Sequence, residues 1–206
     1  MFQLFFKKIF TARNNSNAGF TMVELIVIIS IFAIVAGITL VNFGGFSSNV
    51  SINNLAYEIA LVLRQTQNLG SSSAQTPFGS LGVKTRGVAF LDDSRGGFQN
   101  SFVVFSDTIR DEKYSPDDDI TNTITIQSSD KIVDIAVGVD DRNPLSCLGG
   151  FASVAFTRPK TDAIIECENQ AGPLGYMRIY LQSVDDPDRS RSVEIWSTGQ
   201  ISVVNK

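Results

Sequence analysis

The hydrophobic and polar positions divide the chain into an apolar run, an amphipathic stretch and a remainder with β periodicity. Residues 20–41 form an apolar run with a single charged residue, Glu24. About 20 predominantly apolar residues are enough to cross a bilayer as a helix. The run therefore predicts a transmembrane helix, which we place at residues 20–43.

A second helical pattern follows the apolar run. Apolar residues recur there at steps of three or four, at Ile52, Leu55, Ile59, Val62 or Leu63, and Leu69. Such a stripe is typical of an amphipathic helix that packs on a core. We therefore expect an amphipathic helix within residues 44–72 that ends near Gly70 and lies over a globular domain.

Glycines interrupt the helical pattern at Gly37 and at the pair Gly44-Gly45. Each glycine in a helix interior costs about 1 kcal/mol relative to alanine. Two interpretations stay open. Glycine allows membrane helices to pack closely, or it marks a point where the helix bends or melts.

From about residue 82 the apolar residues alternate with polar ones, which is the period of a β-strand. The predicted strands are 83–91, 101–106, 123–126, 132–139, 151–157, 163–167 and 176–182. A hairpin with Gly199 in its turn is expected to close the chain, with Val193 and Ile195 on one arm and Ile201 and Val203 on the other. The predicted fold class is α+β. A long N-terminal helix is expected to pack on an antiparallel sheet, and residues 73–206 are expected to form the β-rich head that contains this sheet.

Charge is distributed unevenly about the apolar run. Residues 1–19 contain Lys7, Lys8 and Arg13 and no acidic residue, which leaves 14 of the 17 basic residues against all 21 acidic ones after position 19. Basic residues beside an apolar span mark its cytoplasmic side. We expect a single-pass protein of the cytoplasmic (inner) membrane with its N-terminus inside and an acidic head outside. An acidic head has little general affinity for nucleic acid.

The junction before the apolar run differs from a secretory signal peptide, whose apolar core precedes its cleavage site. The sequence Gly19-Phe20-Thr21-Met22-Val23-Glu24, followed by the apolar run, resembles the processing site of type IV prepilins. The resemblance implies that residues 1–19 are a leader cut off after Gly19 by a prepilin peptidase, which then methylates the amino group of Phe20. It also implies assembly with other pilin or pseudopilin subunits through an assembly platform membrane protein.

Placing the charged side chain of Glu24 in the apolar run costs free energy. A charged residue costs about 2.5–3.5 kcal/mol at the centre of a membrane helix and less near its end. The resemblance implies that its partner is the Phe20 amine of a neighbouring subunit, with Glu24 and Thr21 as assembly residues. The alternative is an ordinary single-span anchor in which Glu24 reaches back to the lipid headgroups.

Three parts of the remainder resemble the minor pilins and pseudopilins that include the H subunit of type II secretion and FimT-like pilins. They are the helix end at residues 59–67, Phe105-Ser106-Asp107 before an acidic turn, and the closing hairpin. The resemblance implies a structural minor subunit of a type II secretion pseudopilus or of a type IV pilus. The alternative is a minor pilin of a transformation or adhesion pilus whose head binds DNA or a surface.

Acidic residues gather in the middle of the chain, and calcium prefers six to eight oxygen ligands. The candidate calcium ligands are Asp107, Asp111, Asp117 and Asp119, with Glu112 and Asp118 between them. Their spacing does not fit an EF-hand loop, because the required glycine is missing. The alternative is a solvated loop in which aspartates cap turns. No other cofactor is expected.

The remaining chemistry is sparse. The chain has no histidine, which excludes His-based zinc sites and Ser–His or Cys–His catalysis, and no catalytic motif is present, so we do not expect an enzyme. We expect Cys147 and Cys167 to form a disulfide, which an exported domain allows; the alternative is two buried free thiols.

DNA capture would need an exposed basic patch. The candidate residues are Arg178, Arg189 and Arg191, and acidic residues at 185, 186 and 188 largely cancel their charge. Nucleic-acid binding is therefore not expected.

Overall fold

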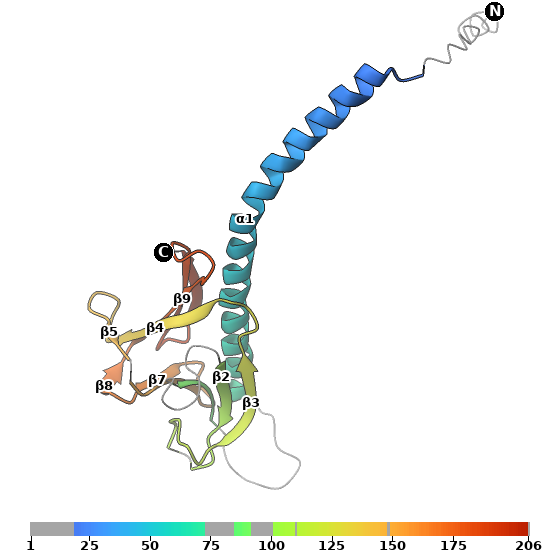
Figure 1. Ribbon diagram of the computed structural model, residues 1–206. Helices are drawn as coiled ribbons and strands as arrows, with labels where there is room; N and C mark the ends of the chain where they lie inside the picture. Colours follow the sequence, from blue (N-terminus) through green and yellow to red (C-terminus); the bar gives the residue numbers. More distant parts are fainter. Residues whose placement is uncertain (1–18, 73–84, 92–100, 110, 148, 206) are drawn as a thin grey trace, which may run out of the picture. The chain divides into compact units, whose positions relative to one another are not determined.

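The computed structural model in Figure 1 describes residues 19–72, 85–91, 101–109, 111–147 and 149–205, and for residues 41–46 the backbone alone. Residues 1–18 of the expected leader and residues 83–84 of the first expected strand lie outside the described residues. The chain divides into two compact units, Met1–Gly44 and Gly45–Lys206.

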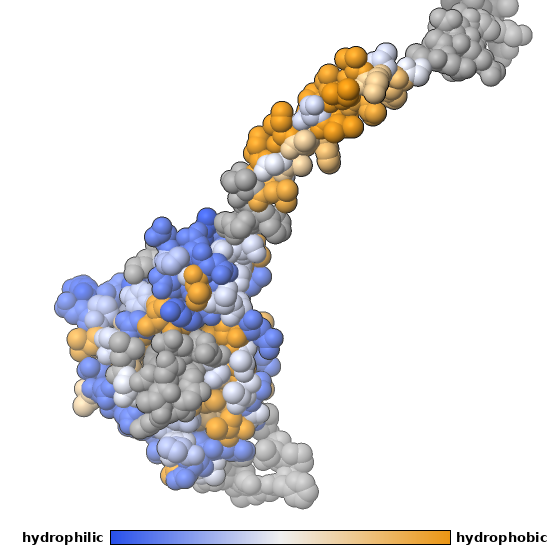
Figure 2. All heavy atoms as spheres, viewed as in Figure 1, coloured by the Kyte–Doolittle hydropathy of each residue, from blue (hydrophilic) through white to orange (hydrophobic). Residues whose placement is uncertain are grey.

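Helix α1 spans Met22–Ser71 and contributes to both units. In the first unit the stretch Met22–Leu40 is long and apolar enough to cross a membrane, and none of it is buried. Figure 2 shows this stretch as a largely hydrophobic surface. Its 19 residues extend about 28 Å at 1.5 Å per residue, close to the thickness of a bilayer's hydrocarbon core.

The hydroxyl groups in this stretch bond within the helix. Ser30 Oγ donates to the Ile26 carbonyl at 2.7 Å, and Thr39 Oγ1 donates to the Ala36 carbonyl at 2.8 Å. Polar groups in a lipid environment must be satisfied internally. These two side chains therefore fit a membrane span.

In the second unit, the part of α1 that follows residue 45 buries one face. The buried hydrophobic residues of this face are Ile52, Leu55, Ala56, Ile59, Ala60 and Leu63. The predicted amphipathic helix is thus confirmed, and it ends at Ser71. Leu69 was wrongly assigned to the buried stripe, because it is exposed and Gly70 is buried. A Cβ at Gly70 would lie 2.6 Å from the Phe156 carbonyl oxygen, so no side chain fits there.

The strands of the described residues form two antiparallel sheets, where the sequence led us to expect one. Sheet A has six strands in the order β3-β2-β1-β6-β7-β8, and sheet B has five in the order β11-β10-β9-β4-β5. The strands are β1 Arg86–Leu91, β2 Ser101–Ser106, β3 Asp119–Thr125, β4 Lys131–Gly138, β5 Leu145–Ser146, β6 Phe151–Phe156, β7 Ala163–Cys167, β8 Gln170–Leu174, β9 Tyr176–Gln182, β10 Ser190–Trp196 and β11 Ile201–Asn205. The fold class is α+β and pilin-like, as predicted.

One hydrophobic core joins the helix to both sheets. Its fully buried members include Ile59 and Leu63 from α1, Phe90 and Val154 from sheet A, and Ile179 and Ile195 from sheet B. Alternation along β9 is regular, since Met177, Ile179 and Leu181 all face this core. Both sheets therefore bury one face on the same stripe of α1.

Polar side chains hold the two ends of this helical segment on the sheets. The contacts are Ser51 Oγ to Asp130 Oδ2 at 2.6 Å, Arg191 Nε to Asn53 Oδ1 at 2.6 Å, Arg64 Nη2 to the Ile201 carbonyl at 3.1 Å, and Gln67 Nε2 to the Thr161 and Gly199 carbonyls at 2.9 Å. Each joins residues far apart in the sequence. Together they fix the rotation of the helix about its own axis.

Candidate functional site

The residues of the expected processing site lie at the start of α1. Thr21 is the N-cap, because its Oγ1 accepts a hydrogen bond from Glu24 N at 3.2 Å and its carbonyl accepts one from Leu25 N at 3.1 Å. An N-cap threonine satisfies a backbone N–H that otherwise has no partner. This role was not predicted above, although Thr21 and Glu24 have the Thr-x-x-Glu spacing of a capping box.

The peptide bond after Gly19 lies outside the helix. Gly19 and Phe20 are both exposed and have no regular secondary structure. Apart from the two neighbours of Gly19 in the chain, no atom of the described residues lies within 4 Å of the place that a Cβ would take there. The backbone at this junction is therefore open on the side of Gly19.

The Glu24 side chain is exposed in the first turn of α1. The partial positive charge of a helix N-terminus favours a carboxylate in this turn. Within the described residues, no hydrogen bond or ion pair reaches the Glu24 carboxylate. Its carboxylate is therefore open to a partner outside the described part of the chain.

Comparison with known protein families bears on this junction directly. A family model described as the prokaryotic N-terminal methylation motif matches residues 14–40. The N-terminal stretch of the chain is type IV prepilin-like. The matched stretch contains Gly19, Phe20, Thr21 and Glu24, and it ends where the candidate membrane span Met22–Leu40 ends. No curated protein and no solved structure matches the chain.

The prepilin-like N-terminus has consequences for partners and location. The motif implies processing by a prepilin peptidase and assembly with other pilins. Together with the apolar helix it indicates a single-pass anchor in the inner membrane. The relation to the H subunit of type II secretion and to FimT-like pilins stays a prediction.

The acidic segment, residues 107–119, uses its carboxylates to hold its own turns. Asp107 Oδ2 accepts a hydrogen bond from Glu112 N at 2.9 Å. Asp118 Oδ1 accepts one from Thr108 N at 2.9 Å, and its Oδ2 accepts one from Ser115 N at 2.7 Å. Asp107 and Asp118 are both buried. This is the turn-capping role that aspartate side chains commonly have.

The four candidate calcium ligands do not form one metal-binding group among the described residues. Only Asp107 is buried, whereas Asp111, Asp117 and Asp119 are exposed. In the part of the chain that the structure describes, no group of three or more His, Cys, Asp or Glu residues is arranged to hold a metal ion. The geometry favours the capping alternative, because backbone amides already occupy the buried carboxylates.

An aromatic cluster holds the acidic segment on the outer face of sheet A. The ring of Tyr114 lies 5.2 Å from that of Phe105 and 5.3 Å from that of Phe151. Lys113 Nζ also bonds Glu166 Oε1 on β7 at 2.9 Å, and this contact raises the pKa of Lys113. This second core was not predicted from the sequence. A signal existed, because four successive residues of β2, from Phe102 to Phe105, are apolar, as in a strand covered on both faces.

Cys147 and Cys167 form a disulfide, with an S–S distance of 1.99 Å and a Cα–Cα distance of 6.0 Å. The disulfide alternative is therefore the one that the structure shows. Cys147 follows β5 in sheet B, and Cys167 is the last residue of β7 in sheet A. The bond is a covalent link between the two sheets.

The arginines considered for DNA capture are engaged within the second unit. Arg178 Nε bonds Glu194 Oε1 at 2.9 Å on the neighbouring strand. Arg189 pairs with Asp186, and Arg191 bonds Asn53 on α1. The charges of Arg178 and Arg189 are thus partly neutralised, and the side chain of Arg191 is held against α1.

The ion pair of Arg178 and Glu194 lies beside a buried tyrosine. The Tyr176 hydroxyl donates to Glu194 Oε1 at 3.4 Å, and Tyr176 is fully buried. Burial raises the pKa of Tyr176 above its ordinary value, and the nearby Glu194 carboxylate raises it further. The guanidinium carbon of Arg178 lies 5.3 Å from the centre of the Tyr176 ring, within the range of a cation–π contact.

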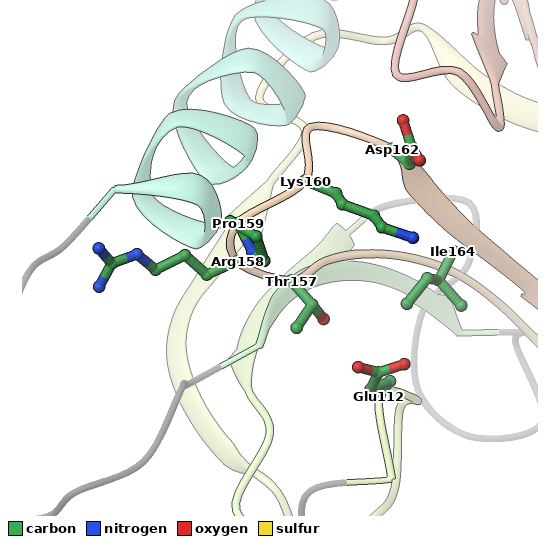
Figure 3. Close-up of a pocket in the computed structure, with 7 residues that line it drawn as sticks. All are labelled: Glu112, Thr157, Arg158, Pro159, Lys160, Asp162 and Ile164. Carbon is green, nitrogen blue, oxygen red and sulfur yellow. The ribbon is translucent and has the colours of Figure 1, made fainter.

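A surface pocket lies where the acidic segment meets the β6–β7 turn (Figure 3), and its volume is about 350 Å³. It is lined by Glu112, Thr157, Arg158, Pro159, Lys160, Asp162 and Ile164. The Thr157 hydroxyl is hydrogen-bonded to the Thr85 hydroxyl at 2.8 Å. The lining contains neither histidine nor cysteine, so the pocket offers no activated nucleophile of the Ser–His or Cys–His type.

Proposed function

We propose that this protein is a structural minor subunit of a type II secretion pseudopilus or of a type IV pilus. The observation that carries the proposal is the methylation motif at the start of an exposed apolar helix, in a chain whose second unit is a β-rich head. A bilayer and a filament core are both apolar environments. The same helix can therefore serve first as a membrane anchor and then as a filament core element.

Processing is the first step of this function. The leader, residues 1–19, is removed by cleavage after Gly19, and the new amino group of Phe20 is methylated. The open, non-helical backbone at Gly19 and Phe20 supports this site, since a peptidase needs access to an extended segment. Cleavage leaves Thr21 in place to begin α1.

Assembly is the second step. After processing, the Phe20 amine and the Glu24 carboxylate stand four residues apart at one end of the apolar helix. The hydroxyls of Ser30 and Thr39 are already satisfied within α1, which leaves Glu24 as the charged side chain that needs a partner. An ammonium group on a neighbouring subunit compensates this charge and fixes the axial register of the two helices, because ion pairs strengthen in a low dielectric.

The partners of this function are the prepilin peptidase, other pilin or pseudopilin subunits and the assembly platform membrane protein. The three basic leader residues favour an N-terminus in the cytoplasm and a head outside. An outside location also fits the disulfide, which persists in oxidising compartments.

A Glu24→Gln variant tests the assembly step, because it removes the charge and keeps the shape of the side chain. Leaving one partner of a desolvated ion pair alone costs about 3–5 kcal/mol, so we expect incorporation into filaments to fall more than about tenfold. Leader cleavage should continue. Ser30→Ala is the matched control in the same helix, and it should assemble normally.

The readouts are the electrophoretic mobility of the processed chain and its amount in sheared filaments. Wild-type incorporation of Glu24→Gln would rule out the register role. Loss of cleavage would instead show that Glu24 acts at the peptidase. Deletion of the gene then distinguishes a secretion pseudopilus from a type IV pilus, since loss of a pseudopilus subunit affects protein secretion and loss of a pilus subunit affects piliation.

A further inference from the structure

The two sheets have four edge strands among the described residues, and three of them are protected against pairing. β5 is only two residues long. β8 contains Gly172 and Pro173, and proline cannot donate to a sheet ladder. On β11 the carbonyl of Ile201 is occupied by the Arg64 side chain. Short strands, proline, charged side chains, β-bulges and covering segments are the means by which proteins block unwanted strand pairing.

The fourth edge strand, β3, is different. It is seven residues long, and six of its residues are exposed. It contains no proline and no lysine, and its single charge is Asp119 at one end. Among the described strands it pairs with β2 alone. Isoleucine and threonine make up five of the seven residues, and β-branched side chains favour strands.

One irregularity is present in β3. The register against β2 shifts between Val104 and Phe105, which leaves Thr121 as the extra residue of a bulge. A bulge increases the local twist of an edge strand. It adds no charge, however, and residues 122–125 pair regularly with β2. The edge thus has much weaker protection than the other three.

The sequence of β3 is symmetric about Asn122. Residues Ile120 to Ile124 read Ile-Thr-Asn-Thr-Ile in both directions. If two copies pair antiparallel about this centre, Asn122 faces Asn122 of the second copy, Thr121 faces Thr123, and Ile120 faces Ile124. Opposed threonines and opposed β-branched residues are favourable cross-strand pairs. A two-fold interface needs such a self-complementary surface.

We propose that strand β3, labelled in Figure 1, is a self-association edge, at which the six-stranded sheets of two copies of this chain pair antiparallel about a two-fold axis at Asn122. This pairing concerns the second unit, and it does not depend on the proposed role of α1 in a filament.

A single cysteine at the axis tests the register. Both native cysteines are in the Cys147–Cys167 disulfide, so Asn122→Cys introduces the one free thiol. Opposed residues of an antiparallel pair have Cα atoms about 4.5–5.5 Å apart, which suits a disulfide. The matched control is Thr125→Cys on the same strand. In the proposed register, position 125 of one copy is offset from position 125 of the other by six residues, or about 20 Å along the strand, and no disulfide spans this distance.

The full chain in native membranes is oxidised and analysed on a non-reducing gel. We expect a covalent dimer for Asn122→Cys, at least about tenfold more abundant than for Thr125→Cys, because only the first thiol lies within disulfide reach of its copy. Equal cross-linking of the two variants, or cross-linking of Asn122→Cys to another protein in place of itself, would overturn the proposal.

Lysine variants test the same register without cysteine. Asn122→Lys places two ammonium groups opposite each other, and like charges directly opposed are unfavourable. Thr125→Lys is the control, since residue 125 faces Asp119 of the second copy and gains an opposite charge. In detergent, the dimer fraction measured by light scattering should fall for Asn122→Lys and hold or rise for Thr125→Lys. A fall in both variants, or in neither, would contradict the two-fold register.

Discussion

The disulfide between the sheets gives a prediction whose size follows from the structure. Cys147 and Cys167 are both buried, and the bond closes a loop with a sequence separation of 20 residues. The double variant Cys147→Ala/Cys167→Ala removes the bond and leaves no thiol that could pair wrongly. Both replacements remain apolar in an apolar core.

The expected loss of stability comes mainly from the unfolded chain. Closing a loop of about 20 residues lowers the entropy of the unfolded state by an amount worth about 3 kcal/mol at 25 °C in the chain-entropy account. The lost sulfur packing adds to this figure, because the two positions are fully or almost fully buried. The free energy of unfolding should therefore fall by at least about 3 kcal/mol.

Urea unfolding followed by tryptophan fluorescence measures this loss. The chain has one tryptophan, Trp196 on β10, whose ring lies 4.8 Å from the ring of Tyr176, so the signal reports on sheet B. Wild-type protein reduced in denaturant and refolded with reductant should match the double variant. A loss below about 1 kcal/mol would refute the view that the bond restrains the two sheets, since it is far under the entropic expectation.

Three further predictions follow from other contacts. Gly87→Ala should destabilise the head by about 1–3 kcal/mol in thermal melts, because its Cβ would lie 2.4 Å from the Phe105 ring in a packed layer. Above pH 10 the tyrosines of the unfolded state lose their protons, while buried Tyr176 keeps its proton in the folded state because its pKa is raised. The free energy of unfolding should therefore fall as the pH rises, by up to about 1.4 kcal/mol per pH unit for this group. Tyr176→Phe should show a flatter decline in the same urea assay. Tyr114→Ala should increase amide hydrogen exchange in the acidic segment, and unchanged exchange there would show that the aromatic cluster does not hold it.

Local periodicity predicted most of the elements. The apolar run, the stripe from Ile52 to Leu63 and the alternation along β9 and β10 each depend on neighbouring residues, and each element is present at the predicted position. The start of β3 was placed four residues too late. The first four residues of β3 are exposed, and Ile120 is the one apolar residue among them, so they show no alternation of apolar and polar positions.

The sheet arrangement was beyond such reasoning. Strand pairing joins distant residues, for example β4 with β9, and periodicity does not encode the partner. β8 was missed because its Gly172 and Pro173 are typical of loops, and they are tolerated here only because β8 is an edge strand.

At the candidate calcium site in the acidic segment, too, the outcome depended on contacts that the sequence does not show. Clustered carboxylates suggested a cation, and the sequence alone could not tell which of them are buried. Asp107 and Asp118 serve backbone amides, and the side chain that positions the segment is Tyr114, which packs on the outer face of sheet A. By contrast the N-terminal junction could be interpreted from sequence, because all of its residues lie in one contiguous stretch.

The central claim is that the chain is a precursor processed at the Gly19–Phe20 bond. Mass spectrometry of the N-terminal peptide of the membrane-extracted protein tests it most directly, with a strain lacking the prepilin peptidase as the control. We expect a mature chain that begins at Phe20 with one methyl group on its amine, and an intact leader in the control strain. A mature chain that begins at another residue, or a leader retained while the peptidase is present, would contradict it.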